Sequence, residues 1–392
     1  MGKNGKPMEH ARMEHLECEY NLPVDLLREI LVRFPVRLLW QLKIVCRSWN
    51  SLISSPEFAM HHLQRSTLTH PPPLLLCWKV PVGLAGDIKH CSSQSLILDR
   101  QHQPQPVSHP GDGKFIRGSC NGLLCLSEGF PYKTLTLLNP STRSVSPSVP
   151  FEGSDECGND FFCGFGYDIL HDQYKLVMGC CASSRLTDSK VRSGAIVFTF
   201  GANPSWKTVD HPVFPYDFRG PRNEIFVSGT LNWLVCDPTS STIDSELEWF
   251  VLTFDLETEL FGRFCLPITR MHRDFCEMPP LQVHNNCLSV CYRTPYEPII
   301  CTLWIMKEHG DETSWIQLFA ITSDVGIDRG SLVAPLYISE DHNLLALDTG
   351  QVLVYNLRQN QLVSRVRHRY DWVYLYRCLE SLVSPSHYCG LN

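Results

Sequence analysis

Cys120 lies in a short motif whose residue types and spacing could carry nucleophilic chemistry. The stretch GSCNGLLCL, from Gly118 to Leu126, begins with G-x-C-x-G, the spacing of a nucleophile elbow with cysteine in the place of serine. An elbow needs a strand before the nucleophile and a helix after it. Here strand-like apolar runs stand on both sides, and Asn121-Gly122 between them is typical of a two-residue hairpin turn. We therefore predict a scaffold hairpin and no catalytic role for Cys120.

The other candidate groups give no catalytic or metal-binding pattern either. The chain has 18 cysteines but no C-x-x-C pair and no zinc-site spacing, and most cysteines lie in apolar runs. We expect buried free thiols in a reducing compartment. GFGYD at 164–168 lacks the lysine and following helix of a phosphate loop, so we predict strand ends, and DSELE at 244–248 is expected to be a solvated loop. We expect no enzyme activity, no catalytic residues, no metal and no cofactor.

The charge and hydropathy of the chain argue against nucleic acid and membrane partners. The net charge is −7 and no basic stripe is present, which argues against a nucleic acid partner. The longest apolar stretch, LLLCWKVPVGLAG near residue 74, is too short to span a membrane and contains Lys79 and Pro81. Residues 1–20 have no apolar signal core, so we expect a flexible N-terminus and a location in the cytoplasm, the nucleus or both.

Two different periodicities divide the rest of the chain. Residues 21–65 place apolar residues at helical spacing, with Asn21 as a cap, Pro35 between two helices, and Ser54 to Pro56 as the end of the last one. A unit this small buries too little to cover its own apolar surface, so the next domain or another protein must cover some of it. Residues 66–73, which contain HPPP, are predicted to be a linker.

From residue 74 to residue 385 the pattern changes to short β-branched and aromatic runs separated by turn residues. NGLLCL, TLNWLV, NCLSVC and HNLLAL repeat one another, and their leucines recur at intervals of about 56 residues, with one interval of about twice that length. A repeat of this size with four strands is typical of a propeller blade, which predicts about six blades. We expect the strands near 74–79 and 95–99 to pair with ESLVSP at 380–385, because an open edge would template aggregation. Residues 386–392 are assigned to a tail.

The helical segment resembles an F-box, and the strand-rich part resembles the plant F-box-associated domain, also described as F-box/kelch-repeat. GSCNGLLCL, LNPSTR, GFGYD with YKLV, SGTLNWL and ESLVSP are similar to recurring elements of that domain. The residues that match an F-box are Leu22-Pro23, Leu26, Glu29-Ile30-Leu31, Phe34-Pro35-Val36, Leu39, Val45-Cys46, Arg47-Ser48-Trp49, Leu52-Ile53 and Ser55-Pro56. The resemblance implies a small all-α F-box module followed by an all-β, kelch-like propeller.

The same resemblance implies a function. An F-box docks on a Skp-type adaptor, and the adaptor links it to a cullin–RING ubiquitin ligase for which the propeller holds a protein substrate. We therefore expect a substrate receptor that is not itself an enzyme. Leu38, Trp40 and Gln41 depart from the usual F-box residues and are expected to affect the choice of adaptor. The expected adaptor-binding residues are Leu22, Pro23, Leu26, Ile30, Leu31, Pro35, Leu39, Val45, Cys46 and Trp49.

Two alternatives stay open at this point. The chain could bind the adaptor without delivering a target for ubiquitination, or it could be an enzyme with a pocket in the propeller. An exposed apolar helical face favours the receptor over the enzyme, because an enzyme does not need such a face. The sequence does not separate the receptor from the adaptor-binding protein, and no residue identifies the substrate.

Overall fold

A computed structural model describes the chain from residue 22 to residue 389 with several gaps. The described ranges are 22–69, 74–78, 88–92, 105–106, 114–128, 134–150, 161–180, 195–210, 224–237, 246–272, 281–293, 299–322, 333–339, 341–348, 351–367 and 374–389. The predicted N-terminal segment 1–20, the HPPP stretch and the run 95–99 lie outside these residues.

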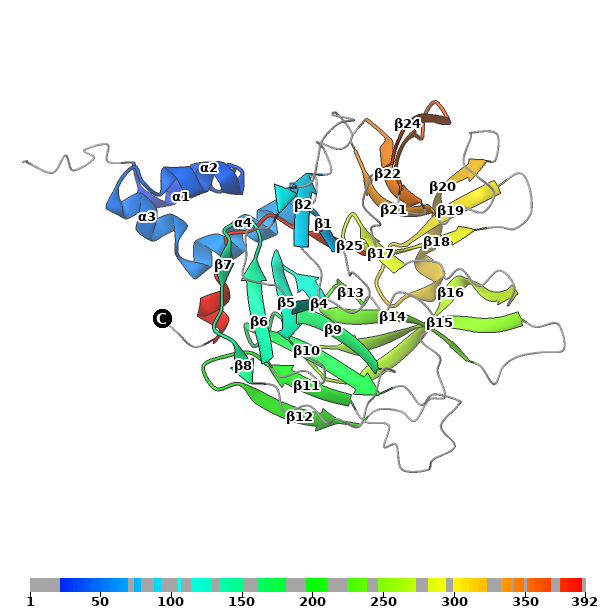
Figure 1. Cartoon of the computed structure of the whole chain (residues 1–392), viewed down its shortest axis with the longest axis horizontal. Helices are drawn as coiled ribbons and strands as arrows, with labels where there is room; N and C mark the ends of the chain where they lie inside the picture. Colours follow the sequence, from blue (N-terminus) through cyan, green and yellow to red (C-terminus); the bar gives the residue numbers. More distant parts are fainter. Residues whose placement is uncertain are drawn as a thin grey trace, which may run out of the picture.

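Residues 22–69, here called the helical module, form four helices (Figure 1), which confirms the predicted run of short helices. Proline begins three of them: Pro23 and Pro35 precede α1 and α2, and Pro56 is the first residue of α4, where a missing N–H costs nothing. Ser55 caps α4 by accepting a hydrogen bond from the backbone N–H of Phe58 at 3.2 Å. The helices are α1 (Val24–Leu31), α2 (Val36–Leu42), α3 (Arg47–Ile53) and α4 (Pro56–Thr69).

The module has a small apolar core of its own. A buried His62 ties α4 to the end of α1, because its Nε2 lies 2.9 Å from the carbonyl oxygen of Phe34. Because α4 continues to Thr69, residues 66–69 are helical, and the predicted linker is correspondingly shorter. The core side chains are Leu31, Val32, Val36, Leu39, Ile53, Phe58, Ala59 and Leu63.

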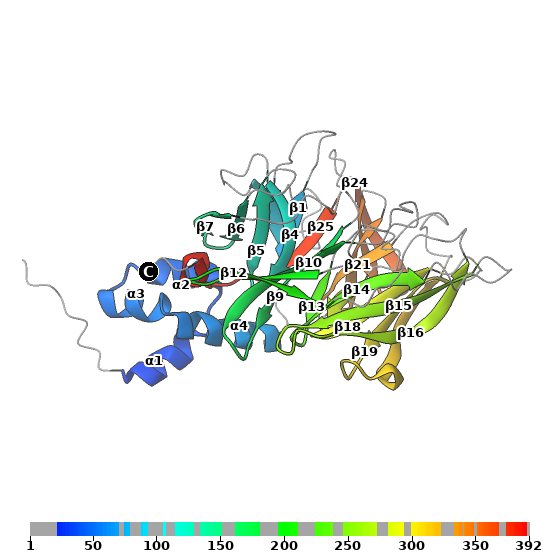
Figure 2. The same cartoon turned by 90° about the horizontal axis from the view of Figure 1, so that it is seen from below.

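The described residues beyond the module form six antiparallel sheets arranged as a propeller, seen in two views in Figures 1 and 2. Five sheets are each built from strands consecutive in sequence, which makes five contiguous blades. The first two of these contain β4 (Lys114–Cys120), β5 (Leu123–Glu128), β6 (Thr134–Asn139), β7 (Ser144–Val145) and β8 (Val149–Pro150), then β9 (Phe161–Asp168), β10 (Gln173–Cys180), β11 (Ala195–Thr199) and β12 (Ser205–Val209).

The remaining three contiguous blades each have four antiparallel strands. The second strand of each blade contains the leucine repeat found in the sequence. A short 3-10 helix, η4 (Glu312–Ser314), lies between β19 and β20. The strands are β13 (Ile225–Val227), β14 (Thr230–Asp237), β15 (Glu246–Asp255) and β16 (Phe261–His272); β17 (Leu281–His284), β18 (Cys287–Arg293), β19 (Ile299–Met306) and β20 (Trp315–Thr322); and β21 (Val333–Ile338), β22 (Asn343–Asp348), β23 (Gln351–Asn356) and β24 (Gln361–Arg367).

The sixth sheet joins the two ends of the propeller chain. Its strand order is β25-β1-β2-β3, so the last strand pairs with the first. The prediction of about six blades is therefore corrected to five contiguous blades and one composite sheet. The strands are β1 (Leu74–Trp78), β2 (Ile88–Ser92), β3 (Gln105–Pro106) and β25 (Tyr374–Cys378).

Closure by the C-terminal end is confirmed, but the predicted partner segment is wrong. Leu76 on β1 pairs with Tyr376 on β25, so residues 374–378 form the closing strand. Residues 380–385 are not a strand. They lie instead against Asn139, at the end of β6, whose Nδ2 donates to the carbonyl oxygens of Ser381 and Val383 at 3.0 and 2.8 Å. The segment assigned to a tail contains a 3-10 helix, η6 (Pro385–Cys389).

Asn139 is also one of several short polar residues that shape the turn after the third strand of a blade. Its Oδ1 accepts hydrogen bonds from the backbone N–H groups of Ser141 and Thr142, which forms the turn after β6. Asp255 and Asn356 occupy the same position in other blades, at the ends of β15 and β23, and their Oδ1 atoms accept from the turns that follow. A short polar side chain at the strand end is thus a repeated turn device.

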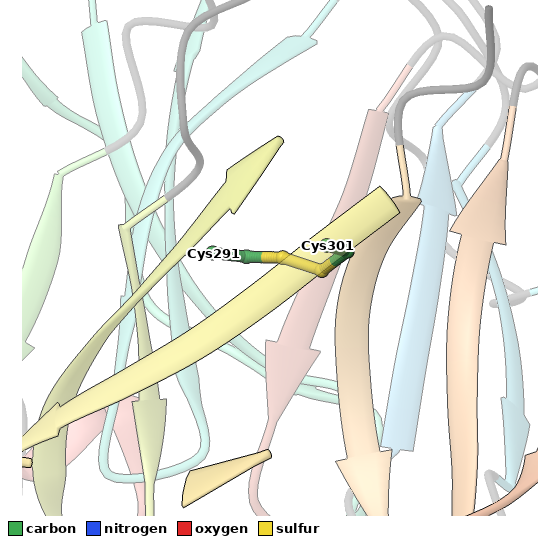
Figure 3. The surroundings of a disulfide bond; sticks show 2 residues. All are labelled: Cys291 and Cys301. Carbon is green, nitrogen blue, oxygen red and sulfur yellow. A yellow bond between two sulfur atoms is a disulfide. The ribbon is translucent and has the colours of Figure 1, made fainter. Parts of the chain in front are cut away.

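One pair of cysteines departs from the predicted free thiols. Cys291 on β18 and Cys301 on β19 form a disulfide, with Cα atoms 6.5 Å apart (Figure 3). Cys291 faces Leu303 and Cys301 faces Arg293 across the two strands, so the cysteines are diagonal neighbours on one face of the sheet. The predicted burial holds for Cys120, Cys125, Cys163, Cys236 and Cys378, whereas Cys265 is exposed.

We predict that Asn139→Ala lowers the free energy of unfolding by about 2–4 kcal/mol, because it removes turn bonds and leaves two buried carbonyl oxygens without their donor. Asn356→Ala is the matched control, since Asn356 has the turn role without the bonds to 381–383, and should cost about 1 kcal/mol. Urea unfolding midpoints of the two variants measure the difference. Equal losses would contradict the role given to Asn139.

Candidate functional site

Exposed apolar side chains gather on the helical module. Half of the large apolar side chains that are exposed among the described residues lie between residues 22 and 45, and Ile44 is 88% exposed. They form two groups: the α1 group, Leu22, Val24, Leu26 and Ile30, and the α2–α3 group, Trp40, Ile44 and Val45. Scattered exposed leucines are normal on a protein surface, but this concentration on a small unit marks a surface that another molecule covers.

The α1 helix explains how such a surface arises. Leu31 is fully buried and Leu27 packs against the module core, while Leu26 and Ile30, one position earlier in each turn, point away from it. A helix that packs on one side needs only one apolar stripe. α1 carries apolar residues on two faces, so one face fills the core and the other has no partner among the described residues.

The ten residues expected to bind an adaptor divide according to burial. The side chains of Leu31 and Leu39 are 0% exposed, so their place is in the core of the module and they are not available on the surface. Cys46 and Trp49 are half-buried, and Trp49 packs against the core. The exposed members of the set are Leu22, Pro23, Leu26, Ile30, Pro35 and Val45.

Sequence reasoning missed Val24 and Ile44 and treated Trp40 only as a departure from the usual pattern. Trp40 is half-exposed, and the Lys43 ammonium lies 4.3 Å from the centre of its ring, in a cation–π contact. Burial lowers the pKa of Lys43. Helical spacing gave no signal for Ile44, because Ile44 lies after the end of α2 at Leu42.

Cys120 has the environment of a structural thiol. It is the last residue of β4, it pairs with Leu123 on β5, and its side chain is 3% exposed. Asn121 and Gly122 have φ values of 53° and 78°, as a two-residue hairpin turn requires. Burial raises the pKa of the Cys120 thiol, which is the opposite of what a nucleophile needs. The predicted hairpin is confirmed.

The remaining polar motifs are structural as well. GFGYD forms the end of β9, as predicted. Lys175 is buried, and its Nζ lies 2.7 Å from Oδ2 of Asp168 and 3.1 Å from Oε1 of Glu259, which belongs to the next blade. Residues 246–248 of the acidic run belong to β15, so the predicted loop is wrong there. Within the described ranges no three His, Cys, Asp or Glu side chains are placed to hold a metal ion. None of the helices that the structure describes is long and apolar enough to cross a membrane.

Glu224 is the most unusual carboxylate near the centre of the propeller. It precedes the inner strand β13, its Oε1 accepts from the backbone N–H of Phe165 at 3.3 Å, and a Cβ at Gly118 would lie 2.0 Å from that oxygen. Burial raises the pKa of Glu224 well above its usual range, and Arg117 acts in the opposite direction. Because protein atoms from three blades fill this place, we assign Glu224 a packing role.

Two comparisons with known families and proteins agree with this division of the chain. Residues 20–61 match the F-box domain, and residues 102–384 match the F-box associated beta propeller domain. The chain is 28% identical over 355 residues to the F-box/kelch-repeat protein At3g23880 of Arabidopsis thaliana, covering 86% of this chain and 88% of that protein. It is 26% identical to the F-box protein CPR1 of the same plant, covering 87% and 83%.

Solved structures give only a distant likeness. The β-propeller domain of Myceliophteria thermophila Cps50 (Swd1) is 9% identical, with a TM-score of 0.36, and the match covers 76% of this chain and 87% of that one. A TM-score of this size adds nothing to the fold described above.

We predict that N-ethylmaleimide modifies the exposed Cys265 of the folded protein and leaves Cys120 unmodified, because the Cys120 thiol is buried and protonated. Peptide mass spectrometry after labelling gives the extent at each site, and labelling in urea is the control that shows Cys120 to be reactive once exposed. Preferential modification of Cys120 in the folded chain would contradict its structural role.

A second prediction concerns Glu224. A carboxyl whose folded pKa is raised contributes stability that is fully present below its unfolded pKa and is lost as the pH rises through the folded pKa. Glu224→Gln keeps the acceptor for Phe165 N–H but does not ionise, so its stability relative to wild type should increase as the pH is raised from about 5 to about 9.

Glu259→Gln is the control of opposite sign for this series. Burial acts upward on the pKa of Glu259, but hydrogen bonds from Lys207 and Lys175 lower it overall. The Glu259→Gln variant should therefore be less stable than wild type at neutral pH, and the difference should shrink as the pH falls through the folded pKa. Melting midpoints at a series of pH values measure both variants. Parallel pH profiles for wild type and Glu224→Gln would refute the assignment.

Proposed function

Because the chain belongs to the F-box proteins that carry an F-box associated β-propeller domain, we propose that it is the substrate receptor of an SCF-type cullin–RING ubiquitin ligase. The helical module docks on a Skp-type adaptor, and the propeller holds a target protein for ubiquitination. The chain itself performs no chemical step. It acts where cullin–RING ligases act, in the cytoplasm, the nucleus or both.

The observation that carries the proposal is the exposed apolar surface of the module. Full burial of a leucine or isoleucine side chain is worth about 1.5–3 kcal/mol, so the α1 group alone offers several kcal/mol to a partner that covers it. Side chains already in the core, such as Leu31 and Leu39, hold α1 and α2 in place for that contact. Within the α2–α3 group, Trp40, which is held beside Lys43, is the residue that departs from the usual F-box.

The position of the module supports a proposal that adaptor and substrate bind at opposite edges of the propeller. The described turns within the blades, such as 121–122, 228–229 and 285–286, are short, and the last of them contacts the module, since Asn286 Nδ2 donates to the carbonyl oxygen of Thr67 at 3.4 Å. Connections such as 181–194 and 211–223 are longer and start from the opposite ends of the antiparallel strands. We place the substrate at that opposite edge, away from the adaptor.

Two finer statements belong to this proposal. The propeller is kelch-like, a description supported by the name of one relative, although the sequence lacks the Gly-Gly pair that is usual in kelch repeats. The alternative, an adaptor-binding protein that delivers nothing to the ligase, predicts that adaptor co-purifies with the chain and cullin does not. A propeller enzyme has no support from the polar clusters among the described residues.

We predict that Leu26→Ala combined with Ile30→Ala weakens adaptor binding by about tenfold to several hundredfold, because the double variant loses apolar area at the interface while the module core stays intact. The control is Leu260→Ala, which truncates an exposed leucine on the propeller. Calorimetric titration with purified Skp-type adaptor gives the dissociation constants. Unchanged binding by the double variant, or an equal loss in the control, would show that α1 is not the docking surface.

A further inference from the structure

The segment that follows β25, residues 379–389, lies between the helical module and the propeller. We call it the C-terminal strap. In Figure 1 its red 3-10 helix, η6, is placed between the blue helices and the strands β6 and β7. Asn139 holds its backbone through the carbonyl oxygens of Ser381 and Val383, and Ser386 Oγ donates to the carbonyl oxygen of Val145 at 3.5 Å. The strap is therefore a fixed part of the fold.

Tyr388 anchors the strap on the propeller side. Its ring packs edge-on against that of Tyr174, with centres 4.7 Å apart, and its hydroxyl donates to Asp172 at 3.1 Å in the turn after β9. Tyr167 donates to the same carboxylate. Tyr388 and Val383 are both buried. One side of the strap is thus bound to two blades by both apolar contact and hydrogen bonds.

The other side of the strap belongs to the module. One continuous apolar cluster contains Phe58 and Leu63 of α4, Leu382 and Tyr388 of the strap, and Leu123 of β5. Opposite charges lie on the two sides: burial raises the pKa of Glu380 in the strap, and the positive charge of Arg37 on α2 acts against this shift. The module, the strap and the propeller therefore contribute side chains to one apolar cluster.

A common apolar cluster affects how freely the module and the propeller can move relative to each other. Domains in one chain move relative to each other unless the interface between them is large and apolar. Here side chains of the module, the strap and the first two contiguous blades belong to one apolar cluster, and the strap directly follows β25, the strand that closes the propeller. The orientation of the module is in this way coupled to the closure of the propeller.

We propose that the C-terminal strap is a clasp that fixes the orientation of the helical module relative to the propeller, and that Leu382, Glu380 and Arg37 are positioning residues for ubiquitin transfer. The second half of this statement rests on the proposed function. An adaptor bound to the module and a target bound to the propeller are then held at one fixed separation. Loss of the clasp leaves both binding surfaces intact and makes the separation variable.

The first experiment measures the orientation itself in the full-length chain, without adaptor or substrate. Labels are placed at Arg47 on α3 and Arg358 in the turn after β23, both exposed, through genetically encoded non-cysteine chemistry, because the chain has 18 cysteines. Single-molecule energy transfer should give one narrow distance distribution for wild type. Leu382→Asp should give a broad one, and Leu382→Met, the conservative control, should stay narrow.

Charge reversal gives a readout that a general loss of stability would not produce. Arg37→Glu and Glu380→Arg should each broaden the distribution, because each places like charges against one another. The double variant, with both charges exchanged, should restore the narrow distribution. A broad distribution in wild type, a narrow one in Leu382→Asp, or a double variant no better than the two single variants would each overturn the clasp.

Reconstituted ubiquitination then tests the functional half. With the strap opened by Leu382→Asp, adaptor affinity and target affinity should be unchanged, while the rate of ubiquitin transfer to the bound target falls and the choice of target lysines becomes less selective. Unchanged rate and lysine selectivity in a chain with a broad distance distribution would overturn the positioning role. If wild type binds no adaptor, the proposed function fails, and the distance measurement still decides the clasp.

Discussion

The shortage of core in the helical module is the constraint on which the rest of the account depends. Four short helices cannot enclose all the apolar residues between 22 and 69, and the structure assigns them to two places. Leu31, Leu39, Phe58 and Leu63 are buried in the cluster that also contains residues of the C-terminal strap and the propeller, and Leu26 and Ile30 stay exposed. The buried group gives the module its shape. The exposed group is the surface that an adaptor would cover.

Closure of the propeller and attachment of the module are linked through the same piece of chain. β25 completes the composite sheet with β1, and the residues immediately after it bind Asn139 and reach the module. The turn residue Asn139 therefore does two things: it shapes its own turn, as Asp255 and Asn356 do in their blades, and it receives the end of the chain. The buried Asn139 amide thus connects the first contiguous blade to the segment that follows the last strand.

Much of this architecture could be predicted from the sequence where a local rule determines the structure. Asn121-Gly122 predicted the hairpin that removes Cys120 from the list of nucleophiles, and the leucine repeat predicted the blades. Predictions failed where the outcome depends on contacts distant in sequence. The segment 380–385 has a strand-like composition, but Asn139 and the module hold it as a strap. The diagonal placement of Cys291 and Cys301 follows from strand register, which the sequence does not reveal.

The candidate site shows the same limit on a smaller scale. The apolar composition of α1 predicts that part of the helix lacks a partner within the module, but only the packed structure separates Leu27 and Leu31, which face the core, from Leu26 and Ile30, which do not. Ile44 lies just after α2, where periodicity no longer applies, so its exposure could not be read from spacing. The sequence therefore predicted an apolar face without a partner in the module, and three-dimensional packing decides which residues are exposed on it.

Hydrogen exchange of the full-length chain, followed by mass spectrometry with and without a purified Skp-type adaptor, tests the central claim most directly. If the exposed apolar residues of α1 and of the α2–α3 turn form the docking surface, adaptor should slow exchange in peptides covering 22–47 and leave the blades unchanged. Slowing confined to the propeller, or no change in 22–47 at saturating adaptor, would contradict the account.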